Sequence, residues 1–248
     1  MGQVGIIGSI TLPLVAAPSH ISIFKLFYKD TSAFLEDVQF YVNSGKIDMI
    51  HAFLKPSGSV PKIVGSDVFE ASSTEFQSAM KSSESRGDLV LFLELGGYIW
   101  NTSSDKCLPL IPPQTRHCIA GEVFHEVQNF QSYITKDPPV VETNNEHGSV
   151  PHPSFASFID EAHVVQLLEY HIHSDNRGND HVNEILIMPV KSNATINKGN
   201  DVPMCPLPHP GDSGLSFFLL FLGSVVCESG DSSEMIMSEI RTHHRSCK

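Results

Sequence analysis

The sequence has few basic residues. Lys and Arg together number 16 against 28 Asp and Glu, which gives a formal net charge of −12 at pH 7. A surface that binds nucleic acid needs clustered Lys and Arg to neutralise phosphates, and here the basic residues are scattered along the chain. We therefore expect no nucleic-acid partner. The 13 His residues allow the net charge to move towards neutral in mild acid.

The chain also lacks closely paired cysteines. Its five Cys are widely spaced, and no two have the C-x-x-C spacing that is typical of zinc and redox motifs. The sequence therefore predicts neither a zinc site nor a disulfide framework. The cysteines lie at positions 107, 118, 205, 227 and 247.

Long hydrophobic runs are missing as well. The longest, Leu215 to Cys227, is too short to cross a bilayer and is interrupted by Gly223. The first residues, Met1 to Leu14, are apolar but carry no basic region of the kind that opens a signal peptide. We expect no membrane partner, and these features do not fix a cellular compartment.

What the sequence does contain is typical of a soluble globular protein. Of its 248 residues, 41% are hydrophobic, and the mean hydropathy is −0.04. Apolar periodicity predicts an α+β fold, with an antiparallel or mixed sheet and helices mainly on one face. Strands are predicted over residues 2–15, 21–28, 46–55, 88–100, 155–159, 183–190 and 215–226, helices over 31–42, 122–133 and 160–173, and a Ser-rich connection over 56–87.

The stretch Gly148 to Ile159 reads G-S-V-P-H-P-S-F-A-S-F-I. Pro151 and Pro153 bracket His152, so the backbone there is held extended and cannot enter a helix. The apolar residues that follow indicate a strand that leaves a rigid elbow. An elbow of this kind can hold a side chain beside a ligand. The alternative is a Pro-rich loop that leads into an ordinary strand.

Four stretches, taken in chain order, resemble cytokinin dehydrogenases. Residues 2–7 (G-Q-V-G-I-I), followed by Ala17-Pro18, are similar to the G-Q-F-G-I-I-T…A-P that ends their flavin-binding domain. Residues 26–37 resemble the family's Y-S-D-F-x-x-F-x-x-D segment, residues 150–153 (V-P-H-P) its V-P-H-P-W motif, and residues 183–190 its G-P-L-I-V-Y-P-L strand. The order and spacing agree over about residues 2–226.

This resemblance implies an FAD-linked oxidase of the vanillyl-alcohol oxidase type, in which two domains face one another across a flavin. The family's reaction takes hydride from the carbon next to the side-chain nitrogen of an N6-substituted adenine, passes it to the flavin, and releases adenine and an aldehyde. We accordingly divide the chain into the end of an FAD-binding domain (residues 1–18), a substrate domain (19–227) and a poorly packed tail (228–248).

The resemblance also implies FAD as the cofactor and assigns two residues to it. Gly5 and Ile7 match positions at which the family's backbone approaches the flavin. The rest of the flavin-binding domain, with its covalent flavin segment and its aspartate base, would precede Met1. We assign no catalytic residue, and we expect the chain to need that missing domain as a partner and to be inactive alone.

Four residues are implied to bind a small, cytokinin-like amine substrate. His152, Ser154 and Ala156 lie in or directly after the V-P-H-P motif, and Glu142 lies where the family places a carboxylate at the mouth of its substrate tunnel. The family has tryptophan and asparagine at the positions of Ser154 and Ala156, so planar stacking is weakened here. A second hypothesis is therefore a non-catalytic small-molecule binding or interaction module derived from the same domain.

Two other patterns predict different chemistry. His171 and His173, with Asp175 or His181, would suit a zinc or non-haem iron site if they lay on a strand. The helix predicted there turns the two histidines about 200° apart, so we assign no metal ligand. Gly211 to Gly214 (G-D-S-G) is similar to the loop around a serine-protease nucleophile, but a simple turn accounts for it.

Overall fold

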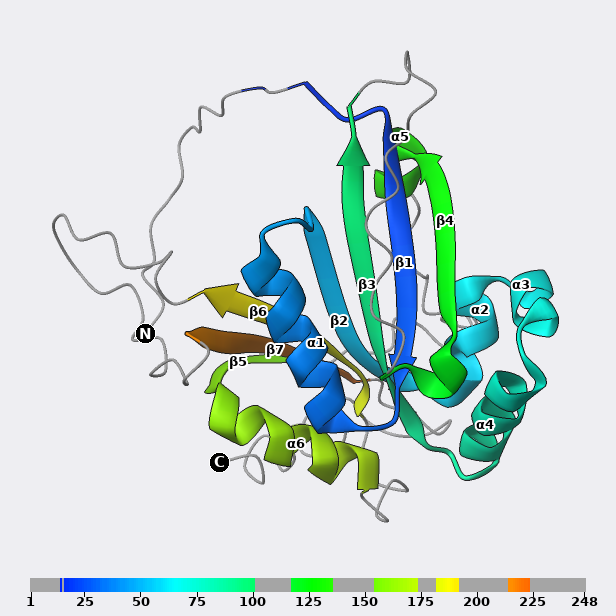
Figure 1. Ribbon diagram of the computed structural model, residues 1–248. Coiled ribbons are helices and arrows are strands. Elements are labelled where there is room, and N and C mark those ends of the chain that lie inside the picture. Colours follow the sequence, from blue (N-terminus) through cyan, green and yellow to red (C-terminus); the bar gives the residue numbers. More distant parts are fainter. Residues whose placement is uncertain are drawn as a thin grey trace, which may run out of the picture.

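The chain folds around an antiparallel sheet in a computed structural model, which describes residues 14, 16–100, 117–135, 154–173, 182–191 and 214–223. The 7 strands run in the order β4-β1-β3-β2-β6-β7-β5 (Figure 1), and every neighbouring pair is antiparallel. They are β1 (His20–Tyr28), β2 (Met49–Pro56), β3 (Leu89–Ile99), β4 (Val123–Asn129), β5 (Ser154–Asp160), β6 (Val182–Lys191) and β7 (Leu215–Gly223).

Helices lie on both sides of this sheet, and the fold is α+β, as the predicted order of elements indicated. Within the described ranges, no helix is long and apolar enough to cross a membrane. The helices are α1 (Thr31–Ser44), α2 (Val60–Val64), α3 (Ser66–Ala71), α4 (Thr74–Ser85), α5 (Phe130–Ile134) and α6 (Glu161–His173), with short 3-10 turns η1 (Ser57–Ser59) and η2 (Ile119–Gly121).

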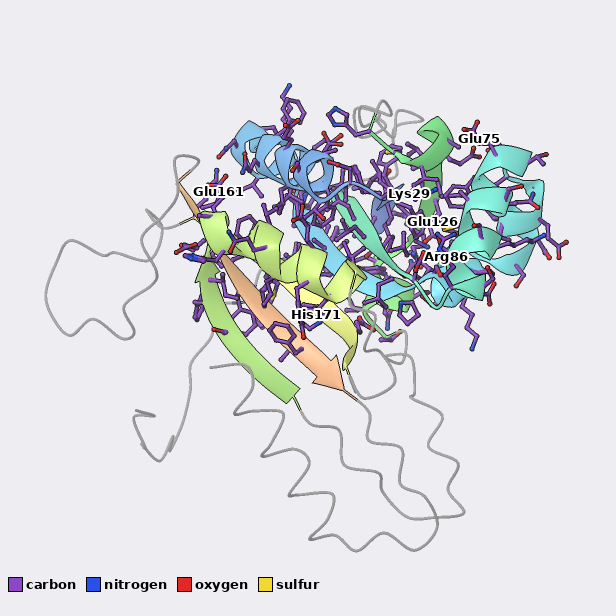
Figure 2. All side chains as sticks on the ribbon, turned by 90° about the horizontal axis from the view of Figure 1, so that it is seen from below. Lys29, Glu75, Arg86, Glu126, Glu161 and His171 are labelled. Carbon is purple, nitrogen blue, oxygen red and sulfur yellow. The ribbon has the colours of Figure 1, made fainter. Side chains whose placement is uncertain are left out.

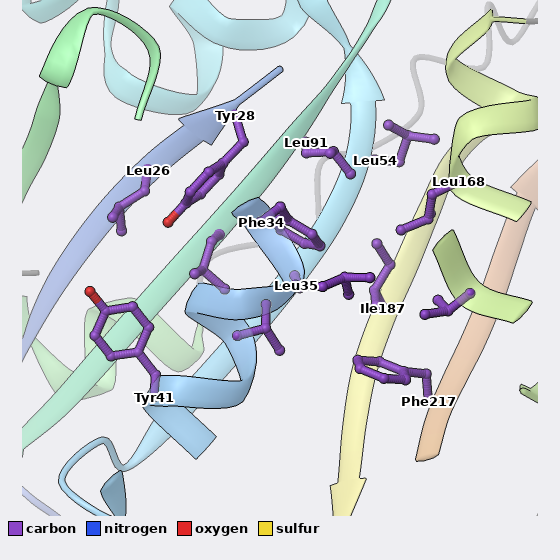
Figure 3. Close-up of a cluster of buried hydrophobic side chains, with 14 of the residues drawn as sticks. Leu26, Tyr28, Phe34, Leu35, Tyr41, Leu54, Leu91, Leu168, Ile187 and Phe217 are labelled. Atoms are coloured by element: carbon purple, nitrogen blue, oxygen red, sulfur yellow. The ribbon is translucent and has the colours of Figure 1, made fainter. Parts of the chain in front are cut away.

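The first face of the sheet packs against α1 and α6 (Figures 1 and 3). Alternate residues of β1, such as Leu26 and Tyr28, point to this face because successive strand residues project to opposite sides. They meet the apolar stripe of α1 and the buried Val164 and Leu168 of α6. This larger core is shown in Figure 3, where Phe34 of α1 lies among the sheet residues.

The second face is covered by α2, α3 and α4 over β4, β1 and β3. Phe27 and Phe92 stack there with ring centroids 5.0 Å apart, and Phe76 of α4 packs 5.7 Å from Phe27. The other buried members of this smaller core are Val60, Phe69, Met80, Val90, Ile119 and Phe124. Strand β1 is buried on both faces, and apolar side chains accordingly project from it to both sides.

A short ladder joins the two halves of the sheet. Strand β2 pairs with β6 through only Ala52↔Ile187, Phe53↔Leu186 and Leu54↔Ile185. Leu54 is fully buried at this joint, on the face where α1 and α6 also contact one another. The packing of these two helices therefore reinforces a joint that has few backbone hydrogen bonds of its own.

Residues 122–133, predicted to be a helix, form strand β4 over Val123–Asn129, and only Phe130–Ile134 is helical. The apolar residues of this segment satisfy a helical spacing by coincidence. Their burial alternates along the strand, with Phe124 buried and His125 exposed. The segment is extended because it pairs with residues 20–26 of β1. Tertiary pairing thus overrides local periodicity.

The Ser-rich connection predicted for residues 56–87 contains three helices. In α4 the buried Phe76, Met80 and Ser83 lie one helical turn apart, and the Ser73 side chain caps the helix by accepting the Phe76 N–H. The helical spacing of α4 is difficult to recognise in the sequence, because only two large apolar residues, Phe76 and Met80, mark its buried side.

Strand β3 runs unbroken from Leu89 to Ile99 through Gly96 and Gly97. Gly96 fits where it is because a Cβ there would lie 2.8 Å from Met49 Cε and 3.1 Å from Ile21 Cδ1. The glycine lets neighbouring strands pack their side chains across β3. It marks close packing and not a turn.

Helix α1 begins at Thr31 and is capped by the residue before it. Asp30 is the cap, and its Oδ1 accepts the Ala33 N–H at 2.6 Å. The expected helix through His173 is confirmed as α6, where Asp160 Oδ1 accepts the His163 N–H at 3.0 Å. Both helices therefore use an acidic cap.

We predict that Leu54→Ala destabilises the protein by about 2–5 kcal/mol, because it removes buried methyl groups and opens a cavity at the joint between the sheet halves. Urea unfolding followed by far-UV circular dichroism measures this loss. Phe40→Ala, which truncates a side chain that is 53% exposed on α1, serves as the control and should change stability far less. Equal losses in the two variants would contradict the assigned core.

Candidate functional site

Of the residues implied to bind cofactor or substrate, Gly5, Ile7, Glu142 and His152 lie outside the described residues. Ser154 and Ala156 fall on β5, the strand that the elbow was predicted to lead into, where they pair with Leu222 and Leu220 of β7. The elbow's exit as a strand is confirmed. Whether any of these residues binds a ligand stays a prediction.

The strand register places Ala156 on the second face of the sheet. Paired residues in antiparallel strands project to the same side, and the pairs run from Ala156 to Leu220, on to Leu186 and Phe53, and so to Phe92. Ala156 is exposed. It therefore shares a face with the core under α2–α4, but at the far edge of the sheet from those helices.

A row of charged and titratable side chains crosses this second face at the opposite end. Lys25 of β1 is the direct cross-strand partner of Glu94 on β3, and Glu94 is the partner of His51 on β2. Strand β4 adds Glu126, diagonal to Lys25. We call Glu126, Lys25, Glu94 and His51 the charged row; their formal charges alternate in sign when the histidine is protonated, the favourable order for cross-strand neighbours.

Lys25 is fixed within the row from two sides. Its Nζ donates to the Ile63 carbonyl oxygen of α2 at 2.8 Å and lies 2.6 Å from Glu126 Oε1. The latter contact is an ion pair without hydrogen-bond alignment, since Glu126 Oε1 has no hydrogen-bond partner among the described residues. The side chain of Lys25 is only 12% exposed, so the pair with Glu126 offsets part of the cost of burying its charge. Figure 2 labels Glu126 beside the α2–α4 helices.

Glu94 lies at the centre of the row, with a side chain that is 14% exposed. Tyr133 of α5 donates its hydroxyl to Glu94 Oε1 at 3.0 Å, and His51 Nδ1 lies 3.6 Å from the same oxygen. Burial alone would raise the pKa of Glu94, but its interactions with His51, Tyr133 and Lys25 outweigh burial and leave that pKa below its ordinary value. Glu94 is therefore ionised at neutral pH.

Tyr133 ties α5 to the sheet. Its hydroxyl lies 3.0 Å from both Glu94 Oε1 and Met49 Sδ, and the carboxylate is the stronger acceptor of its single proton. Burial and the nearby charge of Glu94 raise the pKa of Tyr133, so it remains a neutral donor. The arrangement fixes a carboxylate, an imidazole and a phenol side by side, which suits recognition of a polar ligand group.

The sequence contains a signal for this row. Lys25 and Glu94 are the charged residues in strand segments that are mostly apolar, H-I-S-I-F-K-L-F-Y and L-V-L-F-L-E-L. Charged residues are rarely buried unless they are paired, so each one predicts a partner on a neighbouring strand. Naming that partner requires the strand register, which the sequence does not supply.

A second polar cluster lies on the first face, between α1 and β1. Tyr28 donates to Asp37 Oδ2 at 3.0 Å, and His117 Nδ1 lies 3.1 Å from Asp37 Oδ1. Asp37 lies in the middle of α1 and is buried. Burial raises the pKa of the neighbouring Cys118 thiol to about 11, which makes it a poor nucleophile. This cluster fastens α1 to the sheet.

The metal hypothesis finds no support among the residues that the structure describes. His171 and His173 are both on α6, and the His171 ring lies 5.7 Å from that of Phe221; Figure 2 labels His171 at this helix. In the described ranges, no group of three His, Cys, Asp or Glu residues is placed to hold a metal ion. Asp175, His181 and the Gly211–Gly214 turn lie outside those ranges, apart from Gly214.

The second face thus has two separate ends. Glu94 lies on β3 and Ala156 on β5, with β2, β6 and β7 between them in the sheet. At the usual strand spacing they are about 19 Å apart. The residues implied by the V-P-H-P motif and the charged row therefore share a face without meeting at one point.

No protein-family model matches the chain, and no curated protein matches it. One similar solved structure is that of an alkyldihydroxyacetonephosphate synthase. The TM-score is 0.44 at 11% identity, and the match covers 92% of this chain but 40% of that one. At this level of similarity the match carries no conclusion about cofactor or reaction.

We predict that the stability contributed by Glu94 depends on pH. Because its pKa is lower in the folded protein, the carboxylate adds stability above its ordinary pKa of 4.5, and this contribution is lost as the pH falls through the lower folded value. Urea unfolding at about pH 7 and about pH 3 should show that Glu94→Gln costs more at the higher pH.

The matched control is Glu70→Gln, which changes an exposed glutamate on α3 and should have little effect at either pH. A Glu94→Gln cost that is the same at both pH values would show that the charge of Glu94 does not contribute to stability.

Proposed function

We propose that this chain provides the substrate-binding half of an FAD-linked oxidoreductase of the cytokinin dehydrogenase type, which acts on the CH–NH bond of N6-substituted adenines. Its partner in the reaction is a flavin-binding domain. The proposal rests on the four collinear motifs in the sequence. The observation that carries it is that the V-P-H-P motif leads into β5, whose register brings Ala156 to the same sheet face as the charged row.

The described residues on this face do not fit the diphosphate of FAD. Their lysines are already paired, Lys25 with Glu126 and Lys55 with Glu184 at 3.0 Å. Glu94 adds a further negative charge, so a diphosphate would meet carboxylates and no unpaired cation there. We therefore assign the binding of FAD to the flavin-binding domain, together with Gly5 and Ile7, and derive no reaction step through it.

The face does fit a flat, largely uncharged ligand. Leu186, Phe218 and Leu220 are only partly buried on it, and Phe158 is 39% exposed with its ring 5.0 Å from that of Phe218. These side chains offer apolar contact to a ring or an alkyl substituent. A purine with an apolar N6 group combines both features.

One observation favours a second function, a non-catalytic module that binds a small molecule. Ser154 and Ala156 stand where the resembling family has tryptophan and asparagine. Ala156 is exposed, and its methyl group cannot form the hydrogen bonds with which an asparagine amide would orient a purine. Binding would then persist without the orientation that hydride transfer needs.

We predict that the purified chain binds N6-isopentenyladenine at least tenfold more tightly than adenine, because each buried methylene adds about 0.8 kcal/mol. Isothermal titration calorimetry in the absence of FAD measures both affinities. Equal affinities would contradict substrate recognition by this half. Adding the chain to a flavin-loaded cytokinin dehydrogenase flavin domain then separates the two functions: substrate-dependent bleaching of the flavin supports the oxidoreductase, and binding without bleaching supports the module.

A further inference from the structure

Among the described residues, no lysine or arginine forms an ion pair with Glu94. Lys25 is the lysine of the charged row. Its ammonium lies 2.6 Å from Glu126 Oε1 and donates to the Ile63 carbonyl oxygen at 2.8 Å. The only ion-pair contact of Glu94 within the described residues is His51 Nδ1 at 3.6 Å. When His51 is neutral, the charged row of Glu126, Lys25, Glu94 and His51 therefore has a net charge of −1.

This negative charge is placed where water solvates it poorly. The Glu94 side chain is 14% exposed, and a carboxylate at such a position needs hydrogen bonds or a cation to offset its desolvation. Tyr133 donates one hydrogen bond to Oε1. Within the described part of the chain, Oε2 has no hydrogen-bond or ion-pair partner, so the carboxylate can accept a further donor.

The surroundings of Glu94 suit a cation that carries an apolar body. His51, with a side chain that is 41% exposed, opens the row to solvent, and its ring lies 6.2 Å from that of Phe53. Met49 adds a polarisable thioether next to Tyr133.

We propose that Glu94, His51 and Tyr133 form a binding site for a small organic ammonium ion, with the ammonium group on the Glu94 carboxylate and the apolar part against the neighbouring aromatic rings. An anion would be repelled by Glu94 and Glu126. A metal ion would lack ligands, because no suitable group of three is present among the described residues. The site does not depend on FAD or on the adenine substrate proposed above.

Benzylamine and benzyl alcohol test this site, because they have nearly the same size and only the amine is charged at neutral pH. Calorimetric titration of the purified 248-residue protein without FAD should show benzylamine binding roughly tenfold to a hundredfold more tightly than the alcohol, the ratio expected for a hydrogen bond to a charged group. Equal affinities for the two compounds in the wild-type protein would overturn the proposal without any variant.

Glu94→Gln should abolish the preference for the amine, while Glu184→Gln should retain it. Glu184 is on the same face and pairs with Lys55 at 3.0 Å, so it controls for the general effect of removing a negative charge. Tyr133→Phe leaves the carboxylate in place and should keep a reduced preference. Benzylamine binding that survives Glu94→Gln, or that is lost equally in Glu184→Gln, would refute the site whatever the outcome of the adenine and flavin experiments.

Discussion

The pairing of β1 with β3 and β4 is the constraint from which the rest of the structure follows. Strand β1 lies inside the sheet and is buried on both faces, so its side chains need an apolar layer above and below. Helices α1 and α6 supply one layer and α2–α4 supply the other. The buried charge on β1, that of Lys25, finds its partners within the fold in Glu126 and the Ile63 carbonyl.

Burying the charged row costs desolvation free energy, so its presence requires an explanation. Replacing buried ion pairs by apolar residues is often neutral or stabilising, so stability alone does not account for charges in strands that are otherwise apolar. Lys25 and Glu126 neutralise each other, whereas Glu94 is held ionised by a tyrosine and a histidine. A carboxylate that is solvated by neutral or weakly basic groups is arranged to meet a positive charge from elsewhere.

Much of the sheet could be predicted from the sequence because its strands have strong local patterns. Strands β1, β2, β3, β6 and β7 all fall close to their predicted ranges, and Asp160 begins its helix as expected. Strand β4 could not be predicted, because its apolar residues also satisfy a helical spacing and only pairing with β1 decides between the two. Helix α4 was hidden by its serines, since its buried side consists of little more than Phe76 and Met80.

The residues of the candidate site likewise fall into those that the sequence indicates and those that only the fold brings together. The sequence pointed to Ser154 and Ala156 through a local motif, and β5 begins where that motif ends. It marked Glu94 only as a charged residue in an apolar strand. The partners of Glu94, which are Lys25, His51 and Tyr133, are distant in sequence and meet it only in the folded sheet. Local motifs can be read from a chain, whereas sites assembled across strands require the fold.

The separation of the two ends limits what one ligand can do on this face. About 19 Å of sheet lie between β3 and β5 at the usual strand spacing, which exceeds the length of a substituted adenine. A ligand against β5 therefore leaves Glu94 free, and an ammonium ion at Glu94 leaves β5 free. If the flavin-binding domain covers the face, it meets both ends at once, and the small side chain of Ala156 gives it room at one of them. A ligand bound at one end of the face therefore does not compete with a ligand bound at the other end.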